Sequence, residues 1–204
     1  MFSFFSNPLL LILWLAALII AVTIHEFAHA FAADRLGDPT PKLAGRLTLN
    51  PLAHLDVLGT LMLLIARFGW GKPVQIDPFN LQNPRRDSAL IALAGPLSNL
   101  LLAVVLSLIL RTGFDFYFVS SFLKLLVMLN VVLALFNLLP IHPLDGFNIV
   151  EGFLPEEQAK DWHSLSSYGL IFLLVLIFPL TNQGSLVSQL LNPPIDFILR
   201  LLLG

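Results

Sequence analysis

Long apolar runs constrain the fold of this chain more than any other feature of its sequence. A helix needs about 20 predominantly apolar residues to cross the hydrocarbon core of a bilayer. Five segments approach that length, and the last is interrupted by Pro193 and Pro194; they are residues 8–33, 88–110, 117–139, 166–180 and 186–203. The sequence therefore predicts an all-α polytopic membrane protein with about five transmembrane helices.

The composition agrees with this class and excludes others. Of the 204 residues, 57% are hydrophobic and only 12% are charged, whereas a typical soluble domain carries about 25% charged residues. The net charge of -2 gives no basis for a nucleic-acid partner. Because the chain has no Cys, disulfides and thiolate metal sites are excluded, and His and carboxylates must hold any metal. The length suits one domain over residues 1–204, with a core at about 8–147 and accessory helices at about 165–204.

Three shorter segments differ from the spanning runs. Residues 55–68 are apolar but too few to cross a bilayer, so we interpret them as a re-entrant segment. Residues 42–49 alternate between apolar and polar side chains, which predicts a short strand or β-hairpin. Residues 69–83 are rich in Gly, Pro and Asn and are predicted to form a loop.

Basic residues favour one orientation in the membrane, because cytoplasmic loops carry an excess of Lys and Arg. With the N-terminus outside and 55–68 re-entrant, only Arg111 and Lys124 fall on the outer side. The predicted cytoplasmic residues are Arg35, Lys42, Arg46, Arg67, Lys72, Arg85, Arg86, Lys160 and Arg200.

Two His near the end of the first apolar run carry the strongest chemical signal. The segment reads His25-Glu26-Phe27-Ala28-His29. Residues four apart share one face of a helix, so both imidazoles can reach one zinc ion, and Glu26 can take a proton from a zinc-activated water. Ionisable residues within a membrane helix are expensive and usually functional, which makes a chance match the weaker explanation.

A second segment supplies a third ligand. Residues 137–146 read Asn-Leu-Leu-Pro-Ile-His-Pro-Leu-Asp-Gly. A catalytic zinc commonly takes three protein ligands and leaves one position for water, so Asp145 is the candidate to complete the pair of His. Gly146 would permit a tight turn that aims the carboxylate inward. Taken alone, Asp145 also fits an ordinary loop at a membrane surface.

Together these motifs resemble the site-2 protease family of intramembrane zinc metalloproteases. In that family a helical H-E-x-x-H and a distant N-x-x-P…L-D-G form the site, and the matching residues here are His25, Glu26, His29, Asn137, Pro140, Asp145 and Gly146. A further similarity is the small-residue segment at residues 94–99, where Gly95, Pro96 and Asn99 are expected to serve helix packing. The resemblance covers about residues 24–147, the catalytic core.

The resemblance implies one zinc per chain, with His25, His29 and Asp145 as ligands and Glu26 as the general base. It also implies that Asn137 hydrogen-bonds the substrate or the developing oxyanion, although a helix C-cap or a polar contact between helices explains Asn137 equally well. The implied activity is hydrolysis of transmembrane protein substrates near the cytoplasmic face of a bacterial or archaeal cell membrane. The oligomeric state stays open.

Other polar residues have less specific interpretations. His54 and Asp56 flank the re-entrant segment. Polar residues at such positions more often lie at the membrane interface than line the site or a water path. His142 lies three residues before Asp145 and is a candidate to orient that ligand. His163 lies in a polar stretch and is expected at the surface. The strand at 42–49 could pair with an extended substrate or simply close the mouth of the site.

Two alternatives come from other functional classes. Intramembrane His and Asp also suit a metal transporter or a metal-sensing scaffold. Such a protein does not need the carboxylate of Glu26 beside the first His, and its polar residues should extend along several helices. A protease-like fold that binds membrane partners without cleaving them is the second alternative, and the complete set of expected catalytic residues argues against it.

Overall fold

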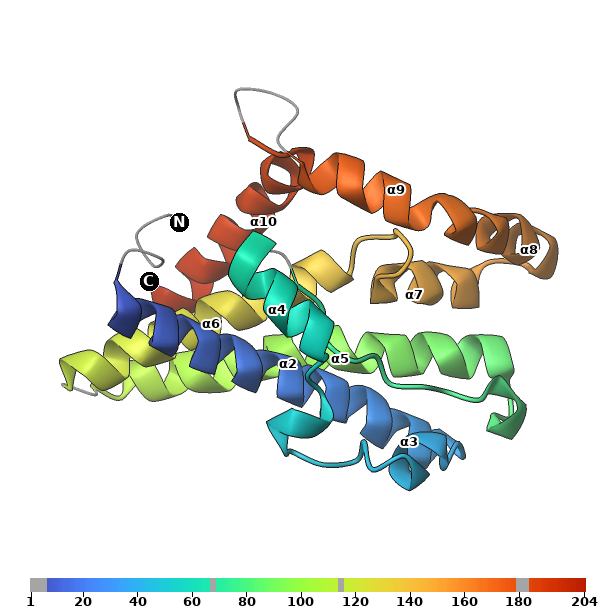
Figure 1. Ribbon diagram of the computed structural model, residues 1–204, viewed down its shortest axis with the longest axis horizontal. Helices are drawn as coiled ribbons and strands as arrows, with labels where there is room; N and C mark the ends of the chain where they lie inside the picture. Colours follow the sequence, from blue (N-terminus) through green and yellow to red (C-terminus); the bar gives the residue numbers. More distant parts are fainter. Residues whose placement is uncertain (1–6, 67–68, 114–115, 179–183) are drawn as a thin grey trace.

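The computed structural model describes residues 7–66, 69–113, 116–178 and 184–204, and this part of the chain is mostly helical. Three long helices lie alongside one another and frame the site: α2 (Pro8–Leu36), α5 (Pro84–Arg111) and α6 (Tyr117–Asn137) (Figure 1). The shorter helices are α3 (Thr40–Leu43), α4 (Val57–Ala66), α7 (Asp145–Phe153), α8 (Glu156–Ser164), α9 (Ser166–Ile177) and α10 (Leu186–Leu203), with 3-10 turns η1 (Pro51–Ala53) and η2 (Pro78–Asn80).

Local chemistry sets both ends of α2. The side chain of Asn7 accepts hydrogen bonds from the backbone N–H groups of Leu9 and Leu10, and Pro8 occupies the first turn, where its missing N–H costs nothing. At the other end Gly37 adopts the left-handed conformation, with φ of 106°, which ends the helix with little strain. The predicted helix over 8–33 therefore continues one turn further, to Leu36.

Small side chains let the three long helices approach closely. Ala17 and Ala103 are fully buried on α2 and α5, and they belong to a core that also contains Val127 and Val131 of α6. In a membrane such close contact supplies the packing energy that apolar burial supplies in water. Helix α5 contacts α2, α6 and α7, so its residues form the central wall against which the site is built.

Four described helices are long and apolar enough to cross a membrane, namely α2, α5, α6 and α10. This corrects the prediction of about five spans. The expected span at 166–180 is the 12-residue helix α9, which is about 18 Å long at 1.5 Å per residue, against a hydrocarbon core of about 30 Å. Phe178 is already extended, and residues 179 and 180 lie outside the described part.

The short α9 also changes where α10 ends. Arg111, the last residue of α5, donates a hydrogen bond of 2.7 Å to the backbone oxygen of Leu201 near the end of α10. Arg200 therefore lies at the same end of the molecule as Arg111. The prediction that Arg200 shares a side with Arg35 and Arg85 is wrong, because the chain crosses one time fewer before α10. The predicted cytoplasmic Arg67 lies outside the described residues.

The predicted β-hairpin at 42–49 is not seen. The described residues form no sheet, and the nearest pairing to this segment is an isolated antiparallel bridge between Leu55 and Gly71. Pro39 and Pro41 flank the start of α3, where their fixed φ suits a first helical turn. Beyond α3 the chain turns without a partner strand, so the alternation of apolar and polar side chains has no ladder to join.

The segment at 55–68 forms the ten-residue helix α4. At about 15 Å such a helix covers only half of a hydrocarbon core, so it cannot cross a membrane alone. Asp56 begins it by accepting the N–H of Gly59 at 2.7 Å. The last two residues of the predicted re-entrant segment, Arg67 and Phe68, lie outside the described part.

Candidate metal centre

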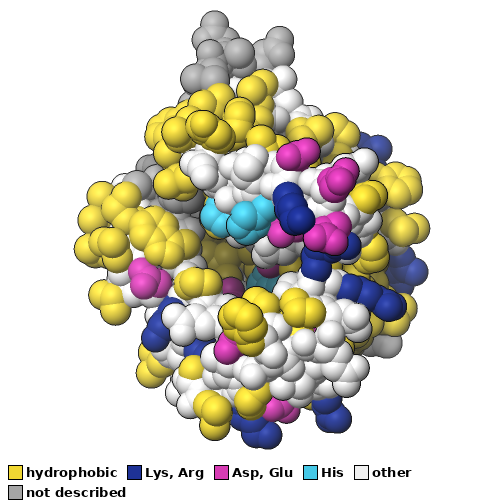
Figure 2. All heavy atoms as spheres, turned by 90° about the vertical axis from the view of Figure 1, so that its right-hand side faces the viewer, with side chains coloured by type: hydrophobic (Ala, Val, Ile, Leu, Met, Phe, Trp, Pro, Cys, Tyr) yellow, Lys and Arg dark blue, Asp and Glu magenta, His cyan; other side chains and the backbone are white. Residues whose placement is uncertain are grey.

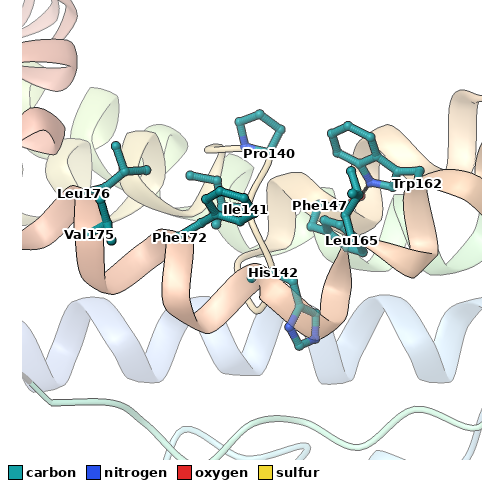
Figure 3. Close-up of a pocket in the computed structure, with 10 residues that line it drawn as sticks. Pro140, Ile141, His142, Phe147, Trp162, Leu165, Phe172, Val175 and Leu176 are labelled. Atoms are coloured by element: carbon teal, nitrogen blue, oxygen red, sulfur yellow. Dashed lines mark hydrogen bonds between the residues drawn. The ribbon is translucent and has the colours of Figure 1, made fainter.

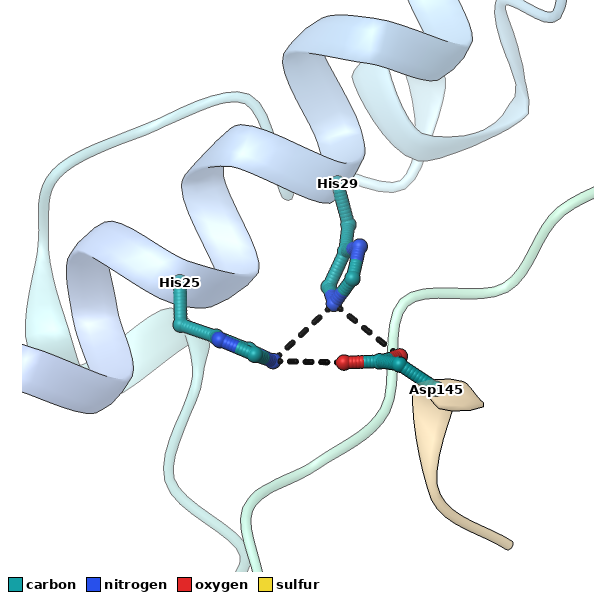
Figure 4. Close-up of side chains that lie close together, drawn as sticks. All are labelled: His25, His29 and Asp145. Atoms are coloured by element: carbon teal, nitrogen blue, oxygen red, sulfur yellow. Dashed lines mark hydrogen bonds and ion pairs between the residues drawn. The ribbon is translucent and has the colours of Figure 1, made fainter. Parts of the chain in front are cut away.

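Two helices from distant parts of the sequence bring three ligand atoms together (Figure 4). His25 and His29 lie one turn apart on α2, and Asp145 is the first residue of α7. The two Nε2 atoms are 3.0 Å apart, Nε2 of His25 is 3.1 Å from Oδ2 of Asp145, and Nε2 of His29 is 3.4 Å from Oδ1. Within the described residues this is the group of His and acidic side chains that could hold a metal ion.

The dimensions and the protonation of this triangle fit zinc. Tetrahedral zinc with bonds of about 2.0–2.1 Å places its ligand atoms about 3.3 Å apart, close to the three observed separations. Oδ2 of Asp145 is buried and has no hydrogen-bond donor. Both Nε2 atoms lie within 3.4 Å of the Asp145 carboxylate, so a cation between the three groups would supply the partner that Oδ2 lacks. A carboxylate binds such a cation in its ionised form.

Helix α5 sets the direction of both imidazoles. Nδ1 of His29 lies 2.7 Å from the backbone oxygen of Ile91, and Nδ1 of His25 lies 2.6 Å from Oδ1 of Asn99. Since a carbonyl oxygen only accepts hydrogen bonds, Nδ1 of His29 must donate, and the lone pair of its Nε2 is left for a metal. Hydrogen bonds from the far ring nitrogen commonly orient metal-binding His in this way.

Two glycines make room for the site. A Cβ on Gly95 of α5 would lie 2.4 Å from Nε2 of His29 and 2.6 Å from Cε1 of His25, so only glycine lets α5 reach the two rings. A Cβ on Gly146 would lie 2.3 Å from the backbone oxygen of Leu138. Gly146 lies inside α7 and is absent from the positive-φ glycines, so its role is this close contact and not the tight turn that the sequence suggested.

Glu26 lies on α2 beside the triangle, with a side chain that is 14% exposed. Oε2 lies 4.0 Å from Nη2 of Arg46. The Arg46 guanidinium is buried and also donates to the backbone oxygens of Ala53 and Lys72. Burial lowers the pKa of Arg46, and the charge of Glu26 opposes that shift; a guanidinium stays protonated in proteins. Arg46 thus fixes the chain on both sides of α4 next to Glu26.

The remaining predicted residues lie in varied surroundings. The amide nitrogen of Asn137 donates to the backbone oxygen of Leu133 at 3.0 Å, one turn back on α6. His54 is fully buried within the protein, and its Nε2 lies 2.8 Å from the backbone oxygen of Thr48. Asp56 caps α4. His163 is exposed and contacts Glu151.

His142 lines an apolar cavity of about 240 Å³ between α9 and the turn that precedes α7 (Figure 3). Its ring stacks edge-on against Phe147, with centroids 5.5 Å apart. The described contacts do not join it to Asp145. The cavity is lined by Pro140, Ile141, His142, Phe147, Trp162, Leu165, Gly169, Phe172, Val175 and Leu176.

The end of the molecule where α2 stops and α5 starts is hollowed. Figure 2 shows that histidine and acidic side chains lie at the edge of the hollow and inside it, while Lys and Arg side chains gather beside it.

Sequence reasoning missed three buried polar residues. Asn99, assigned to packing, contacts His25; Asn130 contacts Asn99; and Arg46, counted only as a loop charge, lies beside Glu26. Asn99 and Asn130 were detectable in principle, because both interrupt apolar membrane helices, where polar residues are usually functional.

The fold and the site define a multi-pass membrane protein with a His, His, carboxylate metal centre and an adjacent glutamate. The model of peptidase family M50 matches residues 13–115 and 113–177. The chain therefore belongs to peptidase family M50, the family of the site-2 proteases, and it is a zinc metalloprotease.

Relatives from three organisms support the assignment to a family of zinc metalloproteases. YwhC of Bacillus subtilis, classed as a zinc metalloprotease, is 40% identical over 97% of this chain and 94% of its own length. Rip2 of Mycobacterium tuberculosis, classed likewise, is 35% identical over 83% of this chain and 68% of its own. The zinc metalloprotease MJ0392 of Methanocaldococcus jannaschii is 25% identical over 89% of this chain and 47% of its own. No solved structure matches the chain.

Proposed function

We propose that this metalloprotease cleaves transmembrane protein substrates within the membrane, with His25, His29 and Asp145 as the ligands of one zinc ion. The observation that carries the proposal is the convergence of two Nε2 atoms, 3.0 Å apart, on the carboxylate of Asp145, whose Oδ2 lies 3.1 Å from Nε2 of His25 and whose Oδ1 lies 3.4 Å from Nε2 of His29. Three electron-pair donors in contact repel one another unless a cation lies between them. A zinc ion held by these three residues would lower the pKa of a bound water to about 7 and would polarise a carbonyl group.

Glu26 acts as the general base. Its carboxylate takes a proton from water as the water oxygen bonds to the peptide carbonyl carbon. The same proton then passes to the amide nitrogen of the leaving group as the C–N bond breaks, which leaves a carboxylic acid and an amine. The position of Glu26 directly after His25 on α2, partly shielded from solvent, supports this role. A metal transporter has no need for such a carboxylate.

Asn137 stabilises the oxyanion that develops on the attacked carbonyl. Its amide has two N–H groups, and one is used by the bond to Leu133. The second is free to donate to a substrate oxygen, an interaction that strengthens as negative charge builds.

Substrate and water reach the site from the hollowed end of the molecule. The proposed gate consists of α4, as a re-entrant element, and the loop at 69–83, because Arg46, beside Glu26, holds Ala53 just before α4 and Lys72 within the loop. Arg35, Lys42, Arg85 and Arg86 lie at this end and favour its cytoplasmic placement. Residues 1–204 act as one catalytic domain, with α9 and α10 as accessory helices.

Zinc content and cleavage, measured on the same samples, test the proposal. Wild type, Glu26→Gln and Asp145→Ala are purified in detergent, and cleavage of a transmembrane peptide is followed. We expect near-stoichiometric zinc in wild type and Glu26→Gln, a large loss of zinc in Asp145→Ala, and cleavage by wild type alone. Normal cleavage by Glu26→Gln would refute the general base, and full zinc in Asp145→Ala would refute the third ligand.

A further inference from the structure

A chain of buried amides connects α6 to the first histidine of the metal centre. Oδ1 of Asn99 on α5 lies 2.6 Å from Nδ1 of His25. Nδ2 of Asn99 donates to Oδ1 of Asn130 on α6 at 2.7 Å, and Nδ2 of Asn130 donates to the backbone oxygen of Leu126 at 2.8 Å. Both Asn side chains are fully buried, so neither amide has water as an alternative partner.

Backbone carbonyls fix the direction of each amide. Leu126 offers Asn130 only an acceptor, so the NH₂ group of Asn130 faces Leu126 and its oxygen faces Asn99. The NH₂ group of Asn99 must then face Asn130, and a second bond of 3.0 Å from the same nitrogen to the backbone oxygen of Ala21 requires the same orientation. The oxygen of Asn99 is left facing His25.

We propose that Asn99 and Asn130 are positioning residues that hold His25 in the tautomer and ring orientation that binding of the metal requires. Oδ1 of Asn99 accepts a hydrogen bond, so Nδ1 of His25 carries the proton and Nε2 keeps its lone pair. A reversed Asn99 amide would donate to Nδ1 and move the ring proton to Nε2, where it would block the metal. The inference rests on the proposed role of His25 as a ligand.

The two histidines differ in how they are held. His29 donates from Nδ1 to the backbone oxygen of Ile91, which no substitution removes. His25 relies on side chains from two other helices. Replacing Asn99 or Asn130 should therefore weaken the metal centre through His25 and not through His29. The hydrogen bond between Asn99 and Asn130 also links the packing of α6 against α5 to metal binding by His25.

The experiment measures zinc affinity by competition with a chelator, using the full chain in detergent. Asn99→Leu removes the acceptor, and we expect its zinc affinity to fall by about 10–100-fold, as for other residues that orient ligands. Asn99→Asp keeps an acceptor for Nδ1 but loses the donor to Ala21 and Asn130, so its affinity should fall less than that of Asn99→Leu. Asn130→Leu, which leaves His25 untouched, should lie between wild type and Asn99→Leu. The control is Ser107→Ala, because Ser107 is also buried on α5 but bonds only within that helix, to Val104.

A visible spectrum of the cobalt(II)-loaded protein separates positioning from general destabilisation, because the intensity and position of its bands report the coordination geometry. We expect an altered spectrum in Asn99→Leu and a wild-type spectrum in Ser107→Ala. Wild-type affinity and spectrum in folded Asn99→Leu, or equal losses in Asn99→Asp and Asn99→Leu, would overturn the proposal. Failure of the ligand assignment itself would appear separately, as zinc retained in His25→Ala.

Discussion

Nη2 of Arg46 lies 4.0 Å from Oε2 of Glu26, and the same guanidinium donates to the backbone oxygens of Ala53 and Lys72. One buried cation thus joins the chain before α4, the chain after it and the proposed general base. This arrangement explains how an irregular segment can pack against α2 without forming a sheet. The planar guanidinium satisfies two carbonyls that the neighbouring strand of a sheet would otherwise satisfy.

Replacing Arg46 should therefore reduce both stability and cleavage. Arg46→Met leaves the partly buried backbone oxygens of Ala53 and Lys72 without this donor, and we expect a loss of about 1–3 kcal/mol in the free energy of unfolding. Zinc content should stay at the wild-type value, because Arg46 contacts no member of the triangle in the described structure. Thermal unfolding in detergent, zinc content and peptide cleavage are measured, with the exposed Arg86→Met as control. Equal behaviour of the two variants would contradict the role assigned to Arg46.

Gly95→Ala should remove zinc while leaving the helices intact. The added Cβ would lie 2.4 Å from Nε2 of His29 and 2.6 Å from Cε1 of His25, so α5 or the rings must move. Alanine is a better helix former than glycine, and helical content by circular dichroism should not fall. Leu97→Ala, on an exposed part of the same helix, should keep its zinc. Stoichiometric zinc in Gly95→Ala would mean that the rings can move aside without losing the metal.

The sequence predicted this site well where geometry is local. Two His four residues apart must share a helical face, so the pairing of His25 with His29 follows from helix geometry alone. The need for a third ligand then directed attention to Asp145, and the structure brings its carboxylate to both rings.

Features that depend on how separate elements pack were not predictable. The contact of Asn99 with His25 depends on the rotation of α5 about its axis, which its nearly uniform apolar sequence does not set. The predicted strand at 42–49 is absent because an alternating pattern alone does not provide a partner strand. Pro39 and Pro41 instead favour the start of a helix, α3. The predicted fourth span, at 166–180, was wrong because α9 ends at Ile177, well short of a bilayer's thickness.

Asp38 should make stability depend on pH. It follows α2 and accepts hydrogen bonds from the backbone N–H groups of Thr40 and Asp77 and from the amide of Asn80, at 2.8–3.0 Å. Burial opposes ionisation, but these hydrogen bonds lower the pKa of Asp38 below its ordinary value of 3.8. A carboxyl whose pKa is lowered on folding stabilises the fold at every pH above its unfolded pKa. That contribution is lost as pH falls through the folded pKa.

Asp38→Asn should accordingly be less stable than wild type at pH 7, and the difference should shrink below about pH 4, near the unfolded pKa of an aspartate. Thermal unfolding in detergent between pH 3 and pH 7 measures this. The exposed Asp161→Asn serves as control and should follow wild type throughout. A constant difference between Asp38→Asn and wild type over this range would show that the charge of Asp38 contributes nothing.

Substitution of Asn137 distinguishes a catalytic role of its side-chain amide from a structural role. If its second N–H stabilises the oxyanion, Asn137→Leu should lower kcat by about 10²–10³-fold, the loss that follows removal of one such donor, while zinc content and KM change little. If the amide serves only its bond to Leu133, the same variant should unfold at a lower temperature with kcat nearly unchanged.

Asn148→Leu, on an exposed position of α7 close to the site in sequence, controls for loss of a polar amide and should leave kcat at the wild-type value. Steady-state cleavage of a transmembrane peptide, with zinc content and thermal unfolding on the same preparations, decides between the two roles.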